Sequence, residues 1–157
     1  MIKDEVKKKL EGKFKDWFVK NPRRIYFTID KSNLRSVAEV LYKDFKMRLS
    51  TVSGVDNGDN FELIYHFGSD KTGELFNVRV FVYERHNPEV DSLVPMFRAT
   101  EWVEREIHEM LGIKFIGHPD LKHLLLDHDW PEGNYPLRKT CILEKKPYPQ
   151  DKEDENG

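Results

Sequence analysis

The fold is decided by residues 61–82, which read FELIYHFGSDKTGELFNVRVFV. On either side of the glycine-bounded loop 68–73, large apolar side chains occupy every second position, which predicts two strands with one buried face. The turn sequence Asp-Asn-Gly-Asp at 56–59 precedes the first strand, and residues 47–55 before it are predicted to form another. Three strands joined in this way predict an antiparallel meander with one face against a core.

Two further elements are predicted on the N-terminal side of the meander. Residues 25–29 alternate in the manner of a strand. Residues 2–18 are predicted to form one amphipathic helix that ends before Asn21-Pro22, because apolar residues recur at four-residue spacing. The apolar stripe of this helix consists of Ile2, Val6, Leu10, Phe14 and Phe18.

The remaining elements complete a two-layer pattern. Ser32 is expected to cap a second helix over 34–45, and residues 84–98 are predicted to be a loop. A third helix is expected to begin near Thr100 as its N-cap, and Gly112 suits the position just after its last turn. The whole pattern predicts an α+β fold in which helices pack a mixed, mostly antiparallel sheet of about four to five strands.

The last forty residues differ from the rest. They contain five of the eight prolines, which exclude a long helix or a central strand, yet they also carry many large apolar side chains. We therefore expect a domain over residues 1–117 and an extended C-terminal tail over 118–157 that wraps along a partner, with its end from about residue 150 disordered when free. The apolar side chains of this tail are Leu121, Leu124, Leu125, Leu126, Trp130, Tyr135, Leu137, Ile142, Leu143 and Tyr148.

Composition limits the classes of function. The net charge of −2 gives no electrostatic basis for binding nucleic acid or an anionic membrane surface. The one cysteine, Cys141, excludes an internal disulfide and an iron–sulfur cluster held by this chain. No apolar run approaches the length of a membrane-spanning helix, so a soluble, cytoplasmic chain is expected. Glutamine occurs once among many Lys and Glu residues, which favours a thermophilic source.

Residues of known catalytic motifs are missing. No glycine-rich loop ends in Lys-Ser/Thr, and no nucleophile elbow occurs. Cys141 as a nucleophile would need a positioned histidine base. His108-Glu109 begins like a zincin helix, but Gly112 stands where the second histidine is required. We expect no catalytic residue in this chain.

Histidine spacing offers an alternative, a metal site. His118, His123 and His128 lie five residues apart and alternate with Asp120, Asp127 and Asp129. Histidine and carboxylate are common metal ligands, but five-residue spacing does not bring side chains to one face of a helix. The other interpretation is that these histidines hydrogen-bond to backbone or partner groups.

The third predicted helix carries a dense charge cluster, Glu104-Arg105-Glu106 with His108 and Glu109. The cluster has two interpretations. It is a solvated helix face, or it is a buried node in which Arg105 is bound by carboxylates of Glu104, Glu106 or Glu109, or by those of a partner.

The same residues carry a family resemblance. Residues 84–140 resemble the 30-kDa subunit of respiratory complex I, the C-subunit of NADH:quinone oxidoreductase, through a long, spaced signature. The sequence Ile-His-Glu-Met-Leu at 107–111 is more similar to the equivalent subunit of membrane-bound [NiFe] hydrogenases and archaeal sulfur-reducing complexes. The matching residues are Glu104, Arg105, Glu106, Glu109, Met110, Leu111, Gly112, Gly117, His118, Pro119, Lys122, Leu124, Leu125, Trp130, Pro131, Gly133, Tyr135, Pro136, Leu137, Arg138 and Lys139.

The resemblance implies a non-catalytic, cofactor-free subunit in the peripheral arm of an ion-translocating oxidoreductase on the cytoplasmic side of the membrane. It implies three kinds of partner: a large catalytic (49-kDa or hydrogenase-like) subunit, a small iron–sulfur subunit and, indirectly, a membrane arm. Iron–sulfur clusters, and a NiFe centre in a hydrogenase, would belong to those partners. The tail would wrap the large subunit, with residues 124–126, Trp130, Tyr135 and Leu137 buried on it and Arg138 and Lys139 bound to its acceptors.

Within this family, a membrane-bound hydrogenase or sulfane sulfur reductase of a thermophilic archaeon is expected first. The C-subunit of an NADH- or other donor:quinone dehydrogenase is the alternative. A free-standing His/carboxylate metal enzyme and an interaction domain without redox partners remain as further alternatives outside the family.

Overall fold

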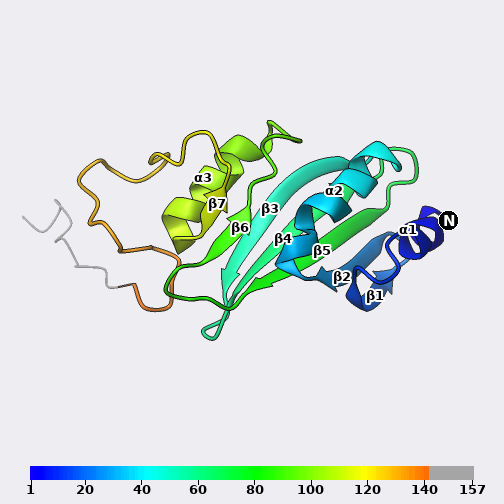
Figure 1. Cartoon of the computed structure of the whole chain (residues 1–157), viewed down its shortest axis with the longest axis horizontal. Coiled ribbons are helices and arrows are strands. Elements are labelled where there is room, and N and C mark those ends of the chain that lie inside the picture. The colour runs from blue at the N-terminus through cyan, green and yellow to red at the C-terminus, as the bar shows by residue number, and fades with distance from the viewer. Residues whose placement is uncertain (142–157) are drawn as a thin grey trace, which may run out of the picture.

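The structure is a computed structural model that describes residues 1–141 (Figure 1). The expectation of disorder from about residue 150 therefore lies outside the described residues. The elements along the chain are α1 (Ile2–Lys9), β1 (Lys15–Asn21), β2 (Arg24–Ile29), the 3-10 turn η1 (Lys31–Asn33), α2 (Leu34–Lys43), β3 (Arg48–Asp56), β4 (Phe61–Gly68), β5 (Leu75–Val82), β6 (Glu89–Asp91), α3 (Thr100–Leu111) and β7 (Lys114–Ile116).

The main sheet has five strands in the order β1-β2-β5-β4-β3. Strands β3, β4 and β5 form the predicted antiparallel meander, and β1 pairs antiparallel with β2. Within this sheet, as the structure describes it, β2 and β5 are the only parallel pair. The prediction of a mixed, mostly antiparallel sheet packed by helices is confirmed.

The alternation in residues 61–82 sets which face of the sheet is buried. Leu63 pairs with Val80 and Tyr65 with Val78, and all four side chains are fully buried on the face that the helices cover. Burying side chains of this size stabilises the fold by roughly 1.5–3 kcal/mol each. The helices add their own apolar stripes to this core, namely Val6 and Leu10 near α1 and Leu34, Val37, Ala38 and Leu41 of α2.

Helix α3 packs beside the edge strand β3, away from α1 and α2 (Figure 1). Gly54 of β3 permits this approach, because a Cβ atom there would lie 2.8 Å from the Cδ1 atom of Leu111. Behind α3, the short strands β6 and β7 pair in parallel, so part of the predicted loop 84–98 is a strand.

The N-terminal helix is the element that the sequence predicted wrongly. Helix α1 ends at Lys9, Gly12 follows in a left-handed conformation, and residues 15–21 form β1. Trp17 stacks on Phe27 of the neighbouring strand at 5.0 Å, so a contact distant in sequence outweighs the four-residue period. Two predicted caps also differ, because Ser32 lies within η1 and Thr100 is the first residue of α3 after its N-cap Ala99.

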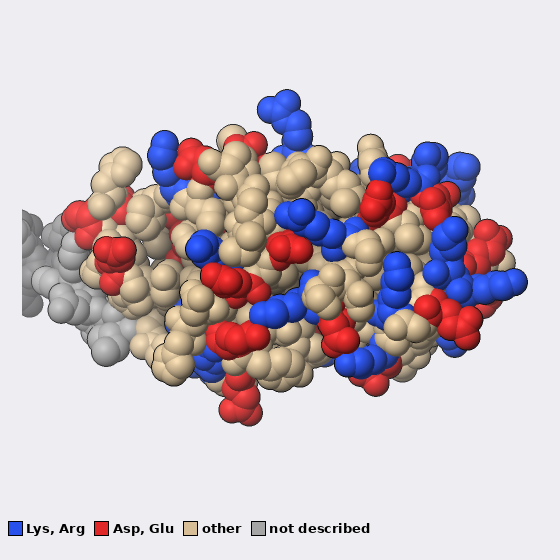
Figure 2. All heavy atoms as spheres, viewed as in Figure 1, with Lys and Arg blue, Asp and Glu red and all other residues tan. Residues whose placement is uncertain are grey.

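The surface carries both signs of charge. Figure 2 shows Lys and Arg interspersed with Asp and Glu over one face, most densely at the end formed by α1. Within residues 1–141, no helix has the length and apolar character needed to cross a bilayer.

Candidate functional site

The C-terminal segment (residues 118–141) has no helix or strand and runs from the end of β7 past α3 to the β3–β4 turn (Figure 1). This irregular course agrees with the proline content that predicted it. The segment is held against the domain mainly by hydrogen bonds that involve its main chain, and side chains of the family signature supply most of them.

Glu109 binds the first part of the C-terminal segment. Its carboxylate is buried and accepts the main-chain N–H groups of Leu124 and Leu125 at 2.8 and 2.7 Å. It also contacts Nδ1 of His123 at 3.2 Å. Burial alone would raise the pKa of Glu109, but the hydrogen bonds from Leu124 and Leu125 outweigh it and hold the pKa below its usual value. Glu109 therefore fixes this turn of the segment as a charged acceptor.

Arg105 binds the main chain one step earlier. Its Nε donates to the carbonyl of Lys122 at 3.1 Å, and its Nη2 donates to the carbonyl of His123 at 2.9 Å. The predicted carboxylate partners of Arg105 are thus replaced by two carbonyls among the described residues. Arg105 and Glu109, one turn apart on α3, bind opposite polar groups of the same stretch.

Glu104 faces the opposite direction, into the domain. It is fully buried and accepts the Ser92 hydroxyl at 2.6 Å and the Leu93 N–H at 2.8 Å, which fixes the loop between β6 and α3. Burial raises its pKa despite these hydrogen bonds. Because Glu104 and Glu109 are both buried, the interpretation of the signature as a solvated helix face is wrong.

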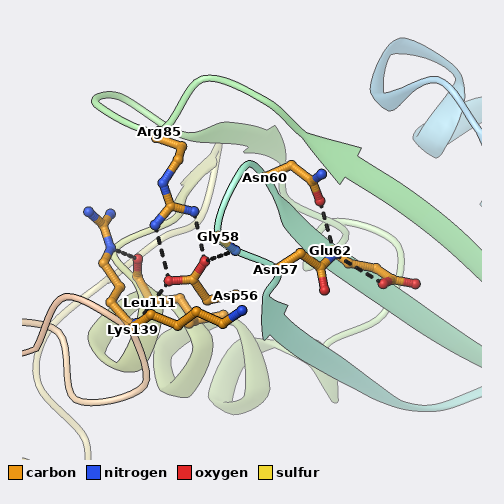
Figure 3. Close-up of polar contacts among 9 residues, drawn as sticks. Asp56, Asn57, Gly58, Asn60, Glu62, Arg85, Leu111 and Lys139 are labelled. Carbon is orange, nitrogen blue, oxygen red and sulfur yellow. Dashed lines mark hydrogen bonds and ion pairs between the residues drawn. The ribbon is translucent and has the colours of Figure 1, made fainter.

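Asp56, at the end of β3, binds the last part of the C-terminal segment (Figure 3). Its carboxylate accepts hydrogen bonds from both terminal nitrogens of Arg85, at 2.7 and 3.0 Å, and from the Gly58 N–H at 2.8 Å. It also accepts the main-chain N–H of Lys139 at 3.0 Å. The hydrogen bond with Arg85 holds the pKa of Asp56 far below its usual value. Asp56 and Arg85 could not be identified as partners from the sequence, since their spacing of 29 residues leaves no local signal.

Arg138, next to Lys139, binds the C-terminal end of α3. Its Nε donates to the Leu111 carbonyl at 2.6 Å, and its guanidinium lies over the rings of Phe61 and Tyr135, at 4.9 and 4.4 Å from their centres. Gly112 makes room for this packing: it has a φ of 75°, and a Cβ there would lie 2.5 Å from the Tyr135 ring. Gly112 thus ends α3, as predicted, and it also lies against Tyr135, which the sequence did not indicate.

The acceptors predicted for Arg138 and Lys139 on a partner are, in part, found within the chain itself. The Arg138 side chain and the Lys139 main chain are bound to Leu111 and Asp56, as described above. Leu137 is also attached through its main chain, since its N–H donates to the Met110 carbonyl at 3.0 Å.

Two of the three histidines that suggested a metal site, His118 and His123, have separate partners. The Nε2 atom of His118 lies 2.9 Å from the Glu101 carbonyl, and its Nδ1 accepts the Asp120 N–H, while His123 contacts Glu109. In residues 1–141, no three His, Cys, Asp or Glu side chains are grouped so that they could hold a metal ion.

Other predicted residues shape the segment. Gly117 has a φ of 86° where the segment leaves β7, and Trp130 donates its indole N–H to the Asn134 carbonyl at 2.5 Å. Lys122 is exposed and pairs with Asp120 at 3.5 Å. Two other signature residues, Pro119 and Pro136, interrupt regular structure in the same stretch.

The segment and α3 line an open cavity of about 680 Å³, to which both contribute residues such as His108, Leu126 and Trp130. Apolar side chains of the segment also face outward: Leu125 is 62% exposed and Leu137 is 60% exposed. The site therefore combines a fixed main chain with uncovered apolar side chains, an arrangement that suits binding of another protein.

Comparison with known proteins agrees with the signature. The family model described as the 30-kDa subunit of respiratory-chain NADH dehydrogenase matches residues 27–147. The C-subunit of NADH-quinone oxidoreductase from Chelativorans sp. is 32% identical over 88% of this chain and 70% of its own length. The C-subunit of F(420)H(2) dehydrogenase from Methanosarcina mazei is 35% identical over 83% of this chain and 85% of its own. The C/D-subunit of NADH-quinone oxidoreductase from Bacteroides thetaiotaomicron is 38% identical over 53% of this chain but 15% of its own.

Solved structures share the fold. A chain in the membrane-bound sulfane sulfur reductase, an archaeal respiratory membrane complex, superposes with a TM-score of 0.80 over 97% of this chain and 96% of its own, at 20% identity. A trypsin-resistant fragment of Nqo5 superposes with a TM-score of 0.63 over 76% of this chain and 96% of its own, at 21% identity. The buried signature, the matched fold and the family match lead to one conclusion: the chain belongs to the 30-kDa subunit family of respiratory-chain NADH dehydrogenase.

Proposed function

We propose that this chain is a non-catalytic, cofactor-free subunit of a membrane-bound, ion-translocating oxidoreductase related to complex I. It lies on the cytoplasmic side of the membrane, in the peripheral arm. There it binds a large catalytic subunit and a small iron–sulfur subunit, which carry the redox centres. Its task is to hold those subunits in a fixed arrangement, so that electron carriers that belong to different chains keep their spacing.

The C-terminal segment is the observation that carries this proposal. Its main chain is attached to the domain at Arg105, Glu109 and Asp56, while the side chains of Leu125 and Leu137 stay exposed. Binding through a flexible segment costs conformational entropy, because the segment must become ordered. A segment whose main chain is already fixed loses little of this entropy when a partner covers its exposed apolar side chains.

The relatives support a neighbouring catalytic subunit. The Bacteroides relative is named as a C/D-subunit, and this chain covers only 15% of it, so the part that matches this chain is continuous there with a much longer sequence. Two subunits joined in one chain lie near each other in space. We therefore place the large subunit as the principal partner of the C-terminal segment.

For the complex itself, we propose a membrane-bound hydrogenase or a sulfane sulfur reductase of a thermophilic archaeon. The superposition over 97% of this chain and the scarcity of glutamine support this choice. A donor:quinone dehydrogenase is the second candidate, because identity to the C-subunit of F(420)H(2) dehydrogenase reaches 35%. Metal analysis of the complex tests the hydrogenase, since nickel in the large subunit identifies it, and assays of sulfur reduction and quinone reduction separate the other two candidates.

The test is assembly. The tagged full-length chain is co-expressed with the polypeptides encoded beside it, and the complex is purified on the tag. The variant Leu125→Asp should reduce recovery of the large subunit at least about tenfold. The substitution leaves the hydrogen bond of Leu125 in place, because that bond uses the main-chain N–H. The matched control is Phe18→Asp on β1, at a side chain of similar exposure, 59% against 62%, and it should leave recovery unchanged.

Point variants are preferable to removing the tail. A chain that ends at residue 117 would leave the buried Glu109 carboxylate without its three donors, so loss of assembly could reflect loss of folding. The proposal is overturned if no redox subunit co-purifies with the wild-type chain, or if Leu125→Asp assembles as well as the control.

A further inference from the structure

A groove lies between α3 and β3, on the side of α3 away from the large cavity under the C-terminal segment. Two adjoining cavities of about 320 and 300 Å³ form it, and Thr51, Val103 and Glu106 line both. Leu124 lines one cavity and Leu137 the other, so the C-terminal segment contributes to both parts of the groove. We call this feature the α3–β3 groove.

The backbone edge of β3 faces the α3–β3 groove. Among residues 1–141, strand β3 is the last strand of the sheet and pairs only with β4. The consecutive residues 49–54 line the groove, although successive side chains of a strand point to opposite faces. A cavity that touches every residue of a strand in turn lies along its edge, where every second N–H and C=O points outward. That edge can accept an extended chain of about six residues.

The other wall of the groove is largely apolar. Val103 and Met110 of α3 line it, and Trp102, 67% exposed, stands at the end nearest Leu124. An added strand would therefore direct alternate side chains against apolar surface.

Glu106 gives the groove its charge. Its signature neighbours Glu104, Arg105 and Glu109 all bind groups of this chain, whereas Glu106 is exposed and has no hydrogen bond or ion pair with any residue from 1 to 141. Of the residues that the structure describes, it is also the one charged residue that lines the two cavities. A single carboxylate in an otherwise apolar and hydroxyl-lined groove favours a cationic group opposite it.

We infer that the α3–β3 groove binds an extended segment of a partner subunit, which adds to β3 as a further strand and places a Lys or Arg side chain against Glu106. The apolar side chains of that segment pack on Val103, Met110 and Trp102. This inference rests on the proposed function, because it requires a partner, and it names a second contact besides the outward side chains of the C-terminal segment.

Charge reversal tests the cationic contact. In the co-expressed full-length complex, Glu106→Lys should weaken binding of the partner subunits at least about tenfold, because two cations then face each other. The matched control is Glu11→Lys, which makes the same change at an exposed glutamate outside the groove and should have no effect. Unchanged binding of Glu106→Lys would overturn the inference.

The apolar wall has its own matched pair. Trp102→Ala should weaken assembly, whereas Tyr83→Ala, at a side chain of nearly equal exposure just after β5 (68% against 67%), should not. Because both side chains are largely exposed, neither change should unfold the chain, and thermal unfolding of the isolated variants checks this.

Amide hydrogen exchange tests strand addition directly. Outward amides among residues 51–55 should exchange fast in the isolated chain and become protected in the complex. Protection in the isolated chain that disappears when residues 142–157 are removed would show that this chain's own C-terminus fills the groove. Protection that appears only as the isolated chain dimerises would show that a second copy fills it. Either result overturns the inference.

The inference and the proposed function fail in different ways. If Leu125→Asp blocks assembly but Glu106→Lys does not, and residues 51–55 stay unprotected in the complex, only the inference fails. If no redox subunit co-purifies with the wild-type chain, the proposed function fails first.

Discussion

The carboxylate of Asp56 accepts the main-chain N–H of Lys139, 83 residues further along the chain, at 3.0 Å. The same carboxylate is bound by both terminal nitrogens of Arg85. The end of the C-terminal segment is therefore fastened to the sheet by an acceptor whose charge is already balanced. Removal of that acceptor should affect both the ion pair and the attachment.

Asp56→Asn should lower the free energy of unfolding by about 3 kcal/mol, because Arg85 then loses its partner in a largely buried position. The ordinary pKa of Asp lies near 4 and the folded one below it, so this stabilisation is present above about pH 4 and is lost as the pH falls. Urea unfolding should show a large difference between the variant and wild type at neutral pH and a smaller one in acid.

Asp59→Asn serves as the control for this prediction, since Asp59 is exposed in the same turn. It should change the stability by less than about 0.5 kcal/mol. Equal stabilities of the Asp56 and Asp59 variants at neutral pH would show that Asp56 does not stabilise the fold through Arg85 and Lys139.

Glu104→Gln should have the opposite pH dependence. The folded pKa of Glu104 is raised, so the folded protein binds its proton more tightly and loses stability as the pH rises from about 4 through that raised value. Glutamine can still accept the Leu93 N–H and does not ionise. The stability of the variant relative to wild type should therefore increase as the pH rises from about 4 through the raised pKa of Glu104, and urea unfolding at a series of pH values measures this. Glu106→Gln, exposed on the same helix, should show no such gain, and a parallel course for Glu104→Gln and wild type would refute the prediction.

Glu109→Gln should loosen the first part of the C-terminal segment. One amide oxygen cannot replace a carboxylate that accepts from Leu124, Leu125 and His123, and the cost should be about 2 kcal/mol. Hydrogen exchange at the amides of Leu124 and Leu125 should accelerate. Glu132→Gln, exposed within the same segment, should leave these rates unchanged. Slow exchange at both amides in the Glu109 variant would be inconsistent with its role as their acceptor.

Gly112→Ala separates backbone strain from contact. Alanine at a φ of 75° costs about 1–2 kcal/mol, and its Cβ would also meet the Tyr135 ring and Arg138. Gly73→Ala carries the same strain at a φ of 69° with no atom within 4 Å of the added Cβ. The Gly112 variant should be less stable than the Gly73 variant and should expose the Leu137 amide to exchange. Equal losses would show that the contact with Tyr135 is not needed.

The sequence predicted the elements that local rules determine. The period-two pattern of residues 61–82 produced the meander, and Gly112 ended α3, because both signals act within a few residues. The same local rules gave the wrong element for residues 14–18. Apolar residues spaced four apart fit a helix, but they are also compatible with strand β1, which the structure has there. Gly12, in a left-handed conformation, marks the end of the helix in retrospect.

The candidate site was harder to predict. Identification of the signature located Arg105 and Glu109 but assigned them to ion pairs, whereas both bind main-chain groups of residues 122–125. Hydrogen bonds to a distant main chain depend on its path and leave no mark in side-chain chemistry. The ion pair of Asp56 with Arg85 was missed because the two side chains are 29 residues apart in the sequence.

The parallel pairing of β2 with β5 has a consequence for biosynthesis. Ile25 pairs with Phe76, so β2 can pair with β5 only after residues up to β5 have left the ribosome. Strands β3, β4 and β5, in contrast, pair with the strand next to them in the sequence. We expect the nascent chain to form this three-stranded unit first and to gain β2 and β1 afterwards. The carboxylates of Glu109 and Asp56 receive their main-chain donors only after all five strands of the sheet have been synthesised, so the C-terminal segment meets acceptors that are already in place.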